Sequence, residues 1–365
     1  MARPLREINR ALPARPASRL ALAAYVAWAL ALTIGSLFPI SSWTARGIDP
    51  FEFLREPWPR WWTTADVALN VVAYLPLGLL GGFALWPRWR GALAVLLVTS
   101  LGATLSLALE ALQNWLPTRI PSRLDLSANA LGTLLGALLG VFLAPRWGAA
   151  TALGRWPDRW LHPAGQSAWL LLIAWLLAQS GPQVRLFGAG NTPLAWQTIG
   201  IPIAERVGWS ALTVATVLES VTVIAALTSV MLIVQASTRA SAPRAAIAAF
   251  IVALALVART TLEAAAIPED ASDHWASAGA LGGLLCGALV ALGAASLGPE
   301  AQQRALLGAL CTLLVAGQIR PELAFHNAAA TAWSSGPWRN VAGFQEGLAN
   351  LWPLLALAWA ARRRL

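Results

Sequence analysis

The chain consists mainly of long apolar blocks separated by short polar or arginine-containing segments. An α-helix of about 20 apolar residues crosses a hydrocarbon core of about 30 Å, and many of these blocks approach that length. Ten blocks can be drawn, at about 20–40, 65–86, 92–114, 124–144, 166–181, 207–235, 243–264, 275–297, 304–319 and 346–361. The pattern therefore predicts an all-α, polytopic transmembrane helix bundle with about ten spans.

Three blocks need separate comment. The first follows five arginines and resembles a secretory signal, but it is long for such a segment and no obvious cleavage site follows it, so we expect a retained helix. The sixth block is the longest, which predicts a tilted or partly extramembrane helix. The last contains Glu346, Asn350 and Pro353, which weaken it, and without it the count is nine.

Composition supports a membrane protein. Hydrophobic residues make up 57% of the chain and charged residues only 12%, whereas a soluble domain has about 25% charged residues. The net charge of +9 does not indicate nucleic-acid binding, because the arginines lie between apolar blocks and form no patch with interleaved aromatic residues. The expected partner is the lipid bilayer, and many of the 20 tryptophans stand at block edges, as in an interfacial aromatic belt.

The arginines also predict orientation, because cytoplasmic segments of membrane proteins are enriched in positive charge. If the N-terminus is cytoplasmic, 16 arginines fall in inside segments and 9 in outside segments, and Arg259 lies within a span. Both termini are therefore expected to be cytoplasmic. The segment 41–64, rich in Trp and Pro, is expected to lie along the outer interface.

Polar residues gather at one end of the second, third and fourth blocks. Asp66 and Asn70 are four apart and share a helical face that Tyr74 continues. At the end of the third block Glu110 and Gln113 share a face. The fourth block opens with a further pair, Asp125 and Asn129, and the arginines of the preceding loop are Arg119 and Arg123. The topology predicts that these groups converge in one cavity at the outer leaflet.

Three chemistries fit such a cavity. A carboxylate in apolar surroundings can act as a general acid or base, and the candidates are Glu110, Asp125 and Asp66. The same three groups, with the amides, could bind a divalent cation, although we assign no metal site and no cofactor. The favoured chemistry is oxyanion binding by arginine, which matches phosphate and carboxylate bidentately. The candidate substrate-binding residues are Arg119, Arg123, Asn70, Tyr74, Gln113 and Asn129.

Structural roles compete with these functions. Thr63-x-x-Asp66 and Ser122-x-x-Asp125 fit the capping-box layout, with Asp in place of Glu or Gln. The deeper groups could form interhelical hydrogen bonds, and the glycines at 132, 136 and 140 predict close helix packing.

The second half offers fewer signals. We expect Glu219 and Arg259 to pair, because an unpaired charge at membrane depth is unfavourable. The cysteines, Cys286 and Cys311, are interpreted as small buried hydrophobic residues. His274 and His326 have no ligand spacing beside them, and no known catalytic or nucleotide-binding fingerprint is present.

A faint internal echo links the two halves. Leu109-Glu110-Ala111 leads to SANALGTLLGALLG from Ser127, and Leu262-Glu263-Ala264 leads to SAGALGGLLCGALV from Ser277. Such an echo can mark duplicated halves, or it can arise by chance in a chain rich in Ala, Leu and Gly.

The segment from Asp66 to Gly140 resembles the VanZ-like family. The matching pieces are DVALNVVAYLPLGLL, the Glu110-x-x-Gln113 pair followed by LP and Arg119, and then Ser122, Asp125 and Asn129-x-x-Gly132. The resemblance predicts a VanZ-like membrane domain over residues 16–150. Residues 165–365 are expected to form an additional helix bundle that resembles no family.

The resemblance implies a multi-pass protein of the bacterial cytoplasmic (inner) membrane, with a cell-envelope role. The family is associated with low-level resistance to teicoplanin and related glycopeptides. The resemblance leaves three hypotheses: binding or modification of a lipid-linked envelope precursor or another anionic headgroup, a non-catalytic scaffold for envelope enzymes, or a transporter or flippase.

Overall fold

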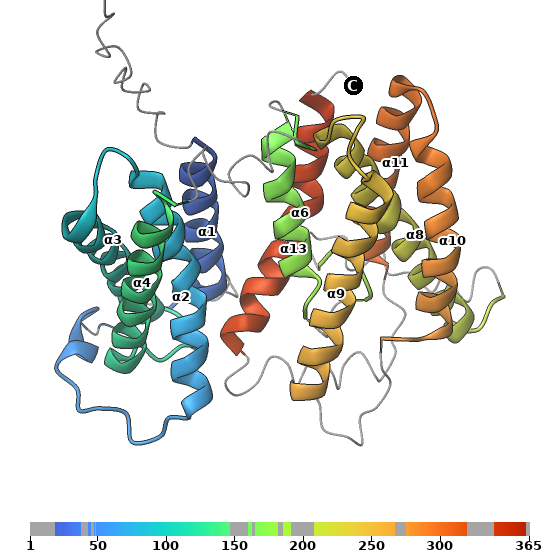
Figure 1. Ribbon diagram of the computed structural model, residues 1–365. Coiled ribbons are helices and arrows are strands. Elements are labelled where there is room, and N and C mark those ends of the chain that lie inside the picture. The colour runs from blue at the N-terminus through green and yellow to red at the C-terminus, as the bar shows by residue number, and fades with distance from the viewer. Residues whose placement is uncertain are drawn as a thin grey trace, which may run out of the picture. The chain divides into compact units, whose positions relative to one another are not determined.

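The computed structural model describes residues 19–37, 43–44, 47, 49–146, 160–162, 165–181, 185–190, 208–266, 275–319 and 339–362 (Figure 1). Regular secondary structure in these ranges is helical, apart from one isolated β-bridge between Leu161 and Thr238. The prediction of an all-α fold is therefore confirmed. The orientation of the termini stays a prediction.

The helices of the described ranges follow the predicted blocks closely. They are α1 (Arg19–Leu37), the short 3₁₀ helix η1 (Glu52–Leu54), α2 (Thr64–Leu85), α3 (Gly91–Gln113), α4 (Arg123–Leu143), α6 (Gln166–Ala178), α8 (Ala211–Ser237), α9 (Arg244–Ala266), α10 (Ala278–Ala295), α11 (Pro299–Gln318) and α13 (Arg339–Arg362). The largest difference concerns α13, which begins at Arg339 and not near residue 346. The polar residues that weaken its apolar pattern lie inside the helix.

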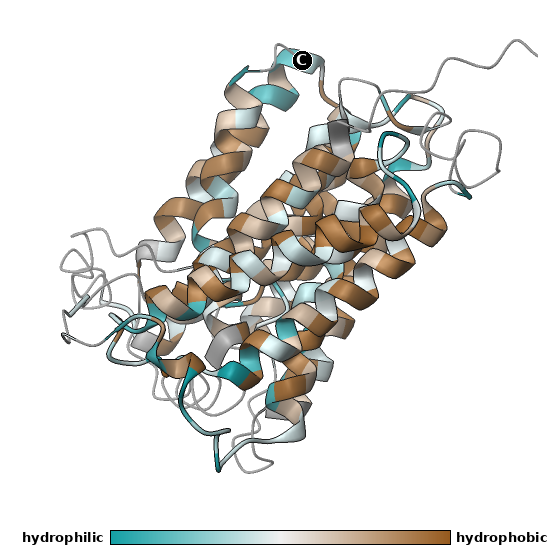
Figure 2. Ribbon diagram, turned by 90° about the vertical axis from the view of Figure 1, so that its left-hand side faces the viewer, coloured by the Kyte–Doolittle hydropathy of each residue, from teal (hydrophilic) through white to brown (hydrophobic). Residues whose placement is uncertain are grey.

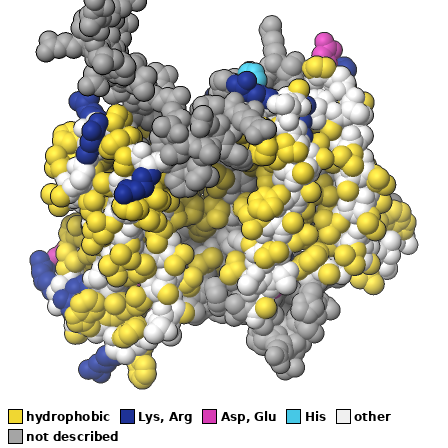
Figure 3. All heavy atoms as spheres, in the orientation of Figure 1, with side chains coloured by type: hydrophobic (Ala, Val, Ile, Leu, Met, Phe, Trp, Pro, Cys, Tyr) yellow, Lys and Arg dark blue, Asp and Glu magenta, His cyan; other side chains and the backbone are white. Residues whose placement is uncertain are grey.

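Six of the described helices, α2, α3, α4, α8, α9 and α10, are long and apolar enough to cross a membrane. Two further apolar stretches, in α1 and α6, are shorter. Hydrophobic residues occupy most of the length of the helices in Figure 2, and hydrophobic side chains cover much of the face shown in Figure 3. Large side chains such as Phe250 and Leu285 point outward with about 70% of their surface exposed, at 69% and 74%. An apolar exterior of this extent fits lipid, so the protein is a multi-pass membrane protein.

The described residues divide into two compact units. The first contains those within Met1–Leu30, Arg46–Asn114 and Thr118–Gly154. The second contains those within Ala31–Ala45, Trp115–Pro117 and Arg155–Leu365.

The first unit is organised by close contact between α2 and α4. A Cβ atom added to Gly132, Gly136 or Gly140 would lie 2.0 to 2.4 Å from a backbone oxygen of α2. The reverse also holds, because a Cβ on Gly78 would lie 2.1 Å from the backbone oxygen of Thr133. The glycine stripe therefore lets the two backbones touch, as the sequence predicted, and this fixes the register of the polar side chains at their ends.

The second unit is built around α8, which packs against α6, α9, α10 and α11. Its apolar window is 67% buried, whereas the other five candidate spans are 22 to 39% buried. Helix α13 packs on α6 and α11, and the Trp352 indole donates a 2.6 Å hydrogen bond to the Leu171 carbonyl oxygen of α6. Helix α8 is therefore the central helix of this unit.

Candidate functional site

The N-terminus of α2 carries the capping box that the sequence predicted. Thr63 Oγ1 accepts a 3.1 Å hydrogen bond from the Asp66 backbone N–H, and Asp66 Oδ2 accepts a 2.9 Å bond from the Thr63 backbone N–H. The Thr63 hydroxyl also donates to Asp66 Oδ2 at 2.8 Å. The Asp66 carboxylate therefore caps the N-terminus of α2. This is the structural role that was the alternative to a catalytic role for Asp66.

The capping box predicted at Ser122 and Asp125 is confirmed for Ser122 and wrong for Asp125. Ser122 caps α4 by accepting a 3.1 Å hydrogen bond from the Leu124 backbone N–H. Asp125 instead accepts a 2.7 Å bond from the Asn70 side-chain amide, so it joins α4 to α2. The close register of these two helices brings Asn70 to the first turn of α4, and the half-buried Asp125 carboxylate uses that donor.

Glu110, near the end of α3, accepts the hydrogen bond from Ser122 that Asp125 would accept in a capping box. Its carboxylate accepts a 2.9 Å hydrogen bond from the Ser122 backbone N–H, and only 4% of the residue is exposed. Arg119, in the loop between α3 and α4, is 5% exposed and interacts electrostatically with Glu110. Asp125 also lies close enough to Glu110 to repel its charge. A buried acid, a buried guanidinium and a loop N–H thus meet in one place.

A layer of uncharged polar groups lies deeper in the same unit. The Tyr74 hydroxyl is hydrogen-bonded to Ser106 of α3, and the Asn129 amide donates a 2.9 Å bond to Ser106 Oγ. Ser106 was not singled out from the sequence, although it precedes Glu110 by one helical turn on the same face. Asn129 Oδ1 is buried without a hydrogen-bond partner among the described residues. An unpaired buried oxygen is unusual in a folded protein and offers an acceptor to a ligand.

The remaining predicted residues occupy different places. Gln113 is buried at the last residue of α3, with 6% of its surface exposed. Arg123 is partly exposed: its guanidinium lies over the Trp58 ring at 5.4 Å from the centroid and donates to the Leu54 carbonyl oxygen at 3.3 Å. Arg119 and Arg123 therefore do not form a single guanidinium pair, because the first is turned into the helix bundle and the second toward the segment before α2.

We define the polar cluster as these groups of the first unit: Asp66, Asn70, Tyr74, Ser106, Glu110, Arg119, Ser122, Asp125 and Asn129. Its members come from α2, α3, α4 and the loop between α3 and α4. Among the described residues, no group of three or more His, Cys, Asp or Glu side chains is placed to hold a metal ion. The arrangement offers proton-transfer groups beside one buried cation and a buried amide oxygen that has no hydrogen-bond partner among the described residues.

Two expectations for the second half are corrected. Arg259 forms its ion pair with Glu263, one turn away on α9, and not with Glu219. Glu219 accepts a hydrogen bond from the Ser277 hydroxyl. Cys286 and Cys311 are exposed on their helices and are not the buried residues expected. His274 and His326 lie outside the described residues.

Comparison with known proteins gives one match. Residues 21–144 match the VanZ/LLP1 family model, and these residues include α1 to α4 almost completely. None of the curated proteins and none of the solved structures compared with the chain matches it. The N-terminal part of the chain, about 150 residues, is therefore VanZ-like, as its motifs predicted.

Proposed function

We propose that this protein acts in the bacterial cell envelope by binding or modifying a lipid-linked or phosphate-bearing headgroup at the polar cluster. The observation that carries the proposal is the buried Glu110–Arg119 arrangement at the α3–α4 loop. Buried charges in a membrane-spanning bundle are unfavourable unless they are paired, and such groups commonly mark functional sites. The proposed location is the cytoplasmic (inner) membrane, with the cluster on its outer side.

The cluster has complementary groups for such a headgroup. Arginine presents donors in a fork that fits phosphate oxygens, and Arg119 and Arg123 lie at two depths on the same loop and helix start. The buried, unpaired Asn129 oxygen can accept a hydrogen bond from a hydroxyl or amine. Glu110 and Asp125 are the proposed acid–base groups, because both are buried or half-buried beside the cluster. Asp66 is the weakest of the three carboxylate candidates, since it caps α2.

Exposed aromatic groups beside the cluster support contact with the membrane interface. Trp58, Trp61 and Trp62 precede α2 and are 56%, 91% and 55% exposed. Tryptophan favours the headgroup level of a bilayer, where one part of the ring is apolar and the other hydrated. A headgroup at that level would be within reach of Arg123, which already stacks on Trp58.

Complementation of a deletion strain tests the proposal. Glu110→Gln, Asp125→Asn and Arg119→Ala should each lose protection against glycopeptides or envelope stress while membrane levels, measured by blot, stay normal. The matched control is Arg55→Ala, which removes an exposed ion pair with Asp49 and should retain function. Retained function in all three cluster variants would contradict the proposal and favour the scaffold. Loss of transport confined to Glu219→Ala would favour a transporter.

Direct binding distinguishes the source of the phosphate. The purified full-length protein in nanodiscs can be titrated with a polyprenyl phosphate, the matching polyprenol and inorganic phosphate. We expect the polyprenyl phosphate to bind at least about tenfold more tightly than the polyprenol, and Arg119→Ala to remove most of that difference. Binding of inorganic phosphate alone would point to a soluble phosphate ligand. Equal binding of the phosphate and the polyprenol would contradict headgroup recognition.

A further inference from the structure

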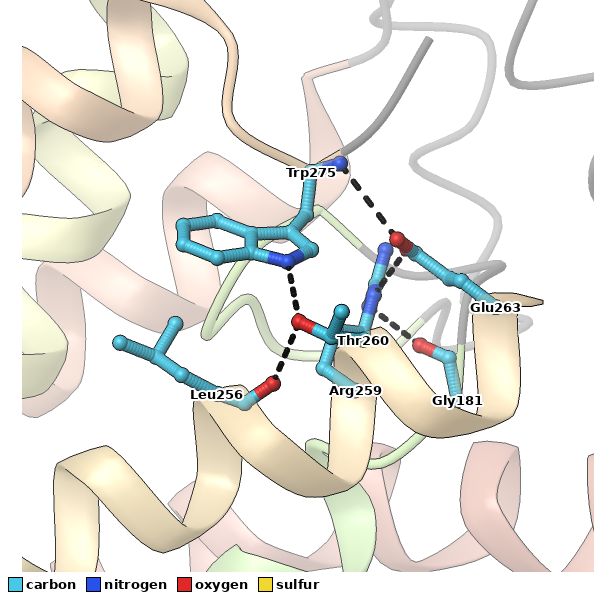
Figure 4. A network of polar contacts seen from close by, with 6 residues as sticks. All are labelled: Gly181, Leu256, Arg259, Thr260, Glu263 and Trp275. Atoms are coloured by element: carbon cyan, nitrogen blue, oxygen red, sulfur yellow. Dashed lines mark hydrogen bonds and ion pairs between the residues drawn. The ribbon is translucent and has the colours of Figure 1, made fainter. Parts of the chain in front are cut away.

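A contact in the second unit repeats one in the first. Glu110 near the end of α3 accepts a hydrogen bond from the backbone N–H that stands 12 residues later, at Ser122. Glu263 near the end of α9 likewise accepts a 3.4 Å bond from the backbone N–H 12 residues later, at Trp275 (Figure 4). In each case a glutamate near the end of one helix is hydrogen-bonded to a backbone N–H that lies just before the next helix.

The first and third helices of the two sets also correspond, although α9 packs far less on α10 than α3 packs on α4. Helices α2, α3 and α4 have 22, 23 and 21 residues, and α8, α9 and α10 have 27, 23 and 18. The third helix of each set is capped by a serine side chain, Ser122 in α4 and Ser277 in α10. In each set the first and third helices pack together extensively.

In both units, glycines spaced four residues apart on the third helix pack against the first helix. Glycines at 132, 136 and 140 of α4 approach the carbonyl oxygens of Val71, Leu75 and Leu79 on α2. In α10 a Cβ added at Gly279 would lie 2.7 Å from the Thr216 carbonyl oxygen of α8, whereas the atoms nearest to Gly283 and Gly287 are side-chain atoms of Val223 and Leu227. A stripe of glycines spaced four residues apart therefore faces the first helix in both units, with backbone contacts in the first and mainly side-chain contacts in the second.

Sequence numbering agrees with this structural match. Glu263 stands 153 positions after Glu110, and the same interval relates Trp275 to Ser122 and Arg259 to Ser106. The interval also relates Glu219 to Asp66, each of which lies on the first helix of its set. The interval differs in the third helices, where it is 147 for the glycines at 132, 136 and 140 against those at 279, 283 and 287, and 155 for the capping serines Ser122 and Ser277. The third helices therefore align only with a shift of several residues relative to the first two.

We propose that α8, α9 and α10 are a diverged second copy of the three-helix unit α2, α3 and α4, in which Glu263 is the counterpart of Glu110. The inference does not rest on the proposed function, and it accounts for the sequence echo that begins at Glu110 and Glu263. The ten-span arrangement predicted from the sequence makes α2 the second span and α8 the sixth. That count predicts that the α3–α4 loop and the α9–α10 loop face the same side of the membrane.

The two copies differ in the charged groups around the glutamate. In the first, the neighbouring guanidinium comes from the loop residue Arg119, and Ser106 lies one turn below Glu110 on α3. In the second, Arg259 takes the place of Ser106, pairs with Glu263 and donates to the Gly181 carbonyl oxygen (Figure 4). The first copy has the uncharged Ser106 at this position, whereas the second has Arg259, which forms an ion pair with Glu263. The second copy therefore keeps the loop contact but not the uncharged layer beneath it.

Cysteine labelling of the full-length protein tests the direction of the copies. In a background in which Cys286 and Cys311 are replaced by alanine, single cysteines are introduced by Ile120→Cys and Ala276→Cys, at exposed positions of the two loops. Two further single variants, Arg88→Cys and Ser241→Cys, mark the opposite ends of the copies. A membrane-impermeant maleimide should label the first pair from one side and the second pair from the other. Labelling of Ile120→Cys and Ala276→Cys from opposite sides would overturn the proposal.

Amide hydrogen exchange tests the shared contact. Glu110→Ala should accelerate exchange in peptides covering 114–122 by about tenfold or more, and Glu263→Ala should do the same only in peptides covering 267–277. The conservative variants Glu110→Gln and Glu263→Gln retain an acceptor oxygen and should show smaller effects, which keeps the test usable if an alanine variant inserts poorly. Unchanged exchange at 267–277 in both Glu263 variants, with acceleration at 114–122 in Glu110→Ala, would contradict a repeated loop contact.

Discussion

At the scale of single residues, two aspartates in the first turns of neighbouring helices have different tasks. Asp66 and Thr63 exchange hydrogen bonds within one helix end, whereas Asp125 bonds to Asn70 across a helix interface. The same sequence layout, a hydroxyl residue followed by an aspartate three positions later, therefore supports a local cap in one case and an interhelical bond in the other. The difference arises because an amide donor from α2 reaches Asp125 but not Asp66.

The reciprocal cap predicts strong coupling between Thr63 and Asp66. Thr63→Ala should lower the free energy of unfolding by about 1 kcal/mol, because the N-terminal N–H groups of α2 lose their acceptor. Asp66→Ala should have a similar effect, and the double variant should lose little more than either single one, since the variants remove shared bonds. Thermal unfolding in detergent or nanodiscs measures this. Fully additive losses would show that the two side chains act independently.

Many of the polar cluster's residues could be predicted from the sequence, because carboxylates and amides in apolar blocks stand out. The partners could not. Helical spacing indicates that Glu110 and Gln113 share a face, but the Glu110–Ser122 contact depends on how the loop between α3 and α4 closes. For the same reason Arg259 was expected to pair with Glu219, although Glu263, one turn away on α9, is its ion-pair partner. Ser106 was missed because serine in a membrane helix is an ordinary packing residue.

At the scale of elements, the apolar pattern located the helices well, because both the length and the composition of a membrane-spanning helix are constrained by the bilayer. The bounds of α2, α3 and α4 differ by about one residue from the predicted blocks. Helix α13 was placed less well, since Glu346, Asn350 and Pro353 lie within it and break its apolar pattern. Hydropathy detects the lipid-facing part of a helix, whereas residues that face other helices are free to be polar.

The close contact between α2 and α4 predicts that a side chain added at Gly136 destabilises the protein. In Gly136→Ala the new Cβ would lie 2.0 Å from the Leu75 carbonyl oxygen, and backbone atoms cannot move aside without separating the helices. We expect a loss of about 1–3 kcal/mol in unfolding free energy, together with loss of the Asn70–Asp125 bond. The matched control is Gly308→Ala in α11, where no atom lies within 4 Å and the variant should be neutral or stabilising. Equal effects of the two substitutions on thermal unfolding would refute the role of the stripe.

At the scale of the whole molecule, the number of membrane crossings follows from how α11 and α13 are counted. Six described helices meet the length and composition expected of a span, and shorter apolar stretches occur in α1 and α6. Helices α11 and α13 are 20 and 24 residues long but more polar. Ten crossings require both to span and eight require neither, and each of these counts places the two termini on the same side. Nine crossings, with α11 in the membrane and α13 outside it, place the termini on opposite sides. The excess of arginine in the inside segments predicts that the N-terminus is cytoplasmic.

Reporter insertion separates these counts. A topology reporter is placed in the full-length chain within the segment 320–338, and a second is placed after Leu365. If α11 and α13 both cross, the first reporter faces outward and the second inward, so alkaline phosphatase is active only in the first and a fluorescent protein glows only in the second. If neither crosses, both reporters face the cytoplasm. We expect the first result, because α13 packs on α6 and α11 and its partner α11 packs on α8, which lies among the candidate spans. Two reporters that both face outward would indicate nine crossings, in which α13 does not span, and would contradict the predicted cytoplasmic C-terminus.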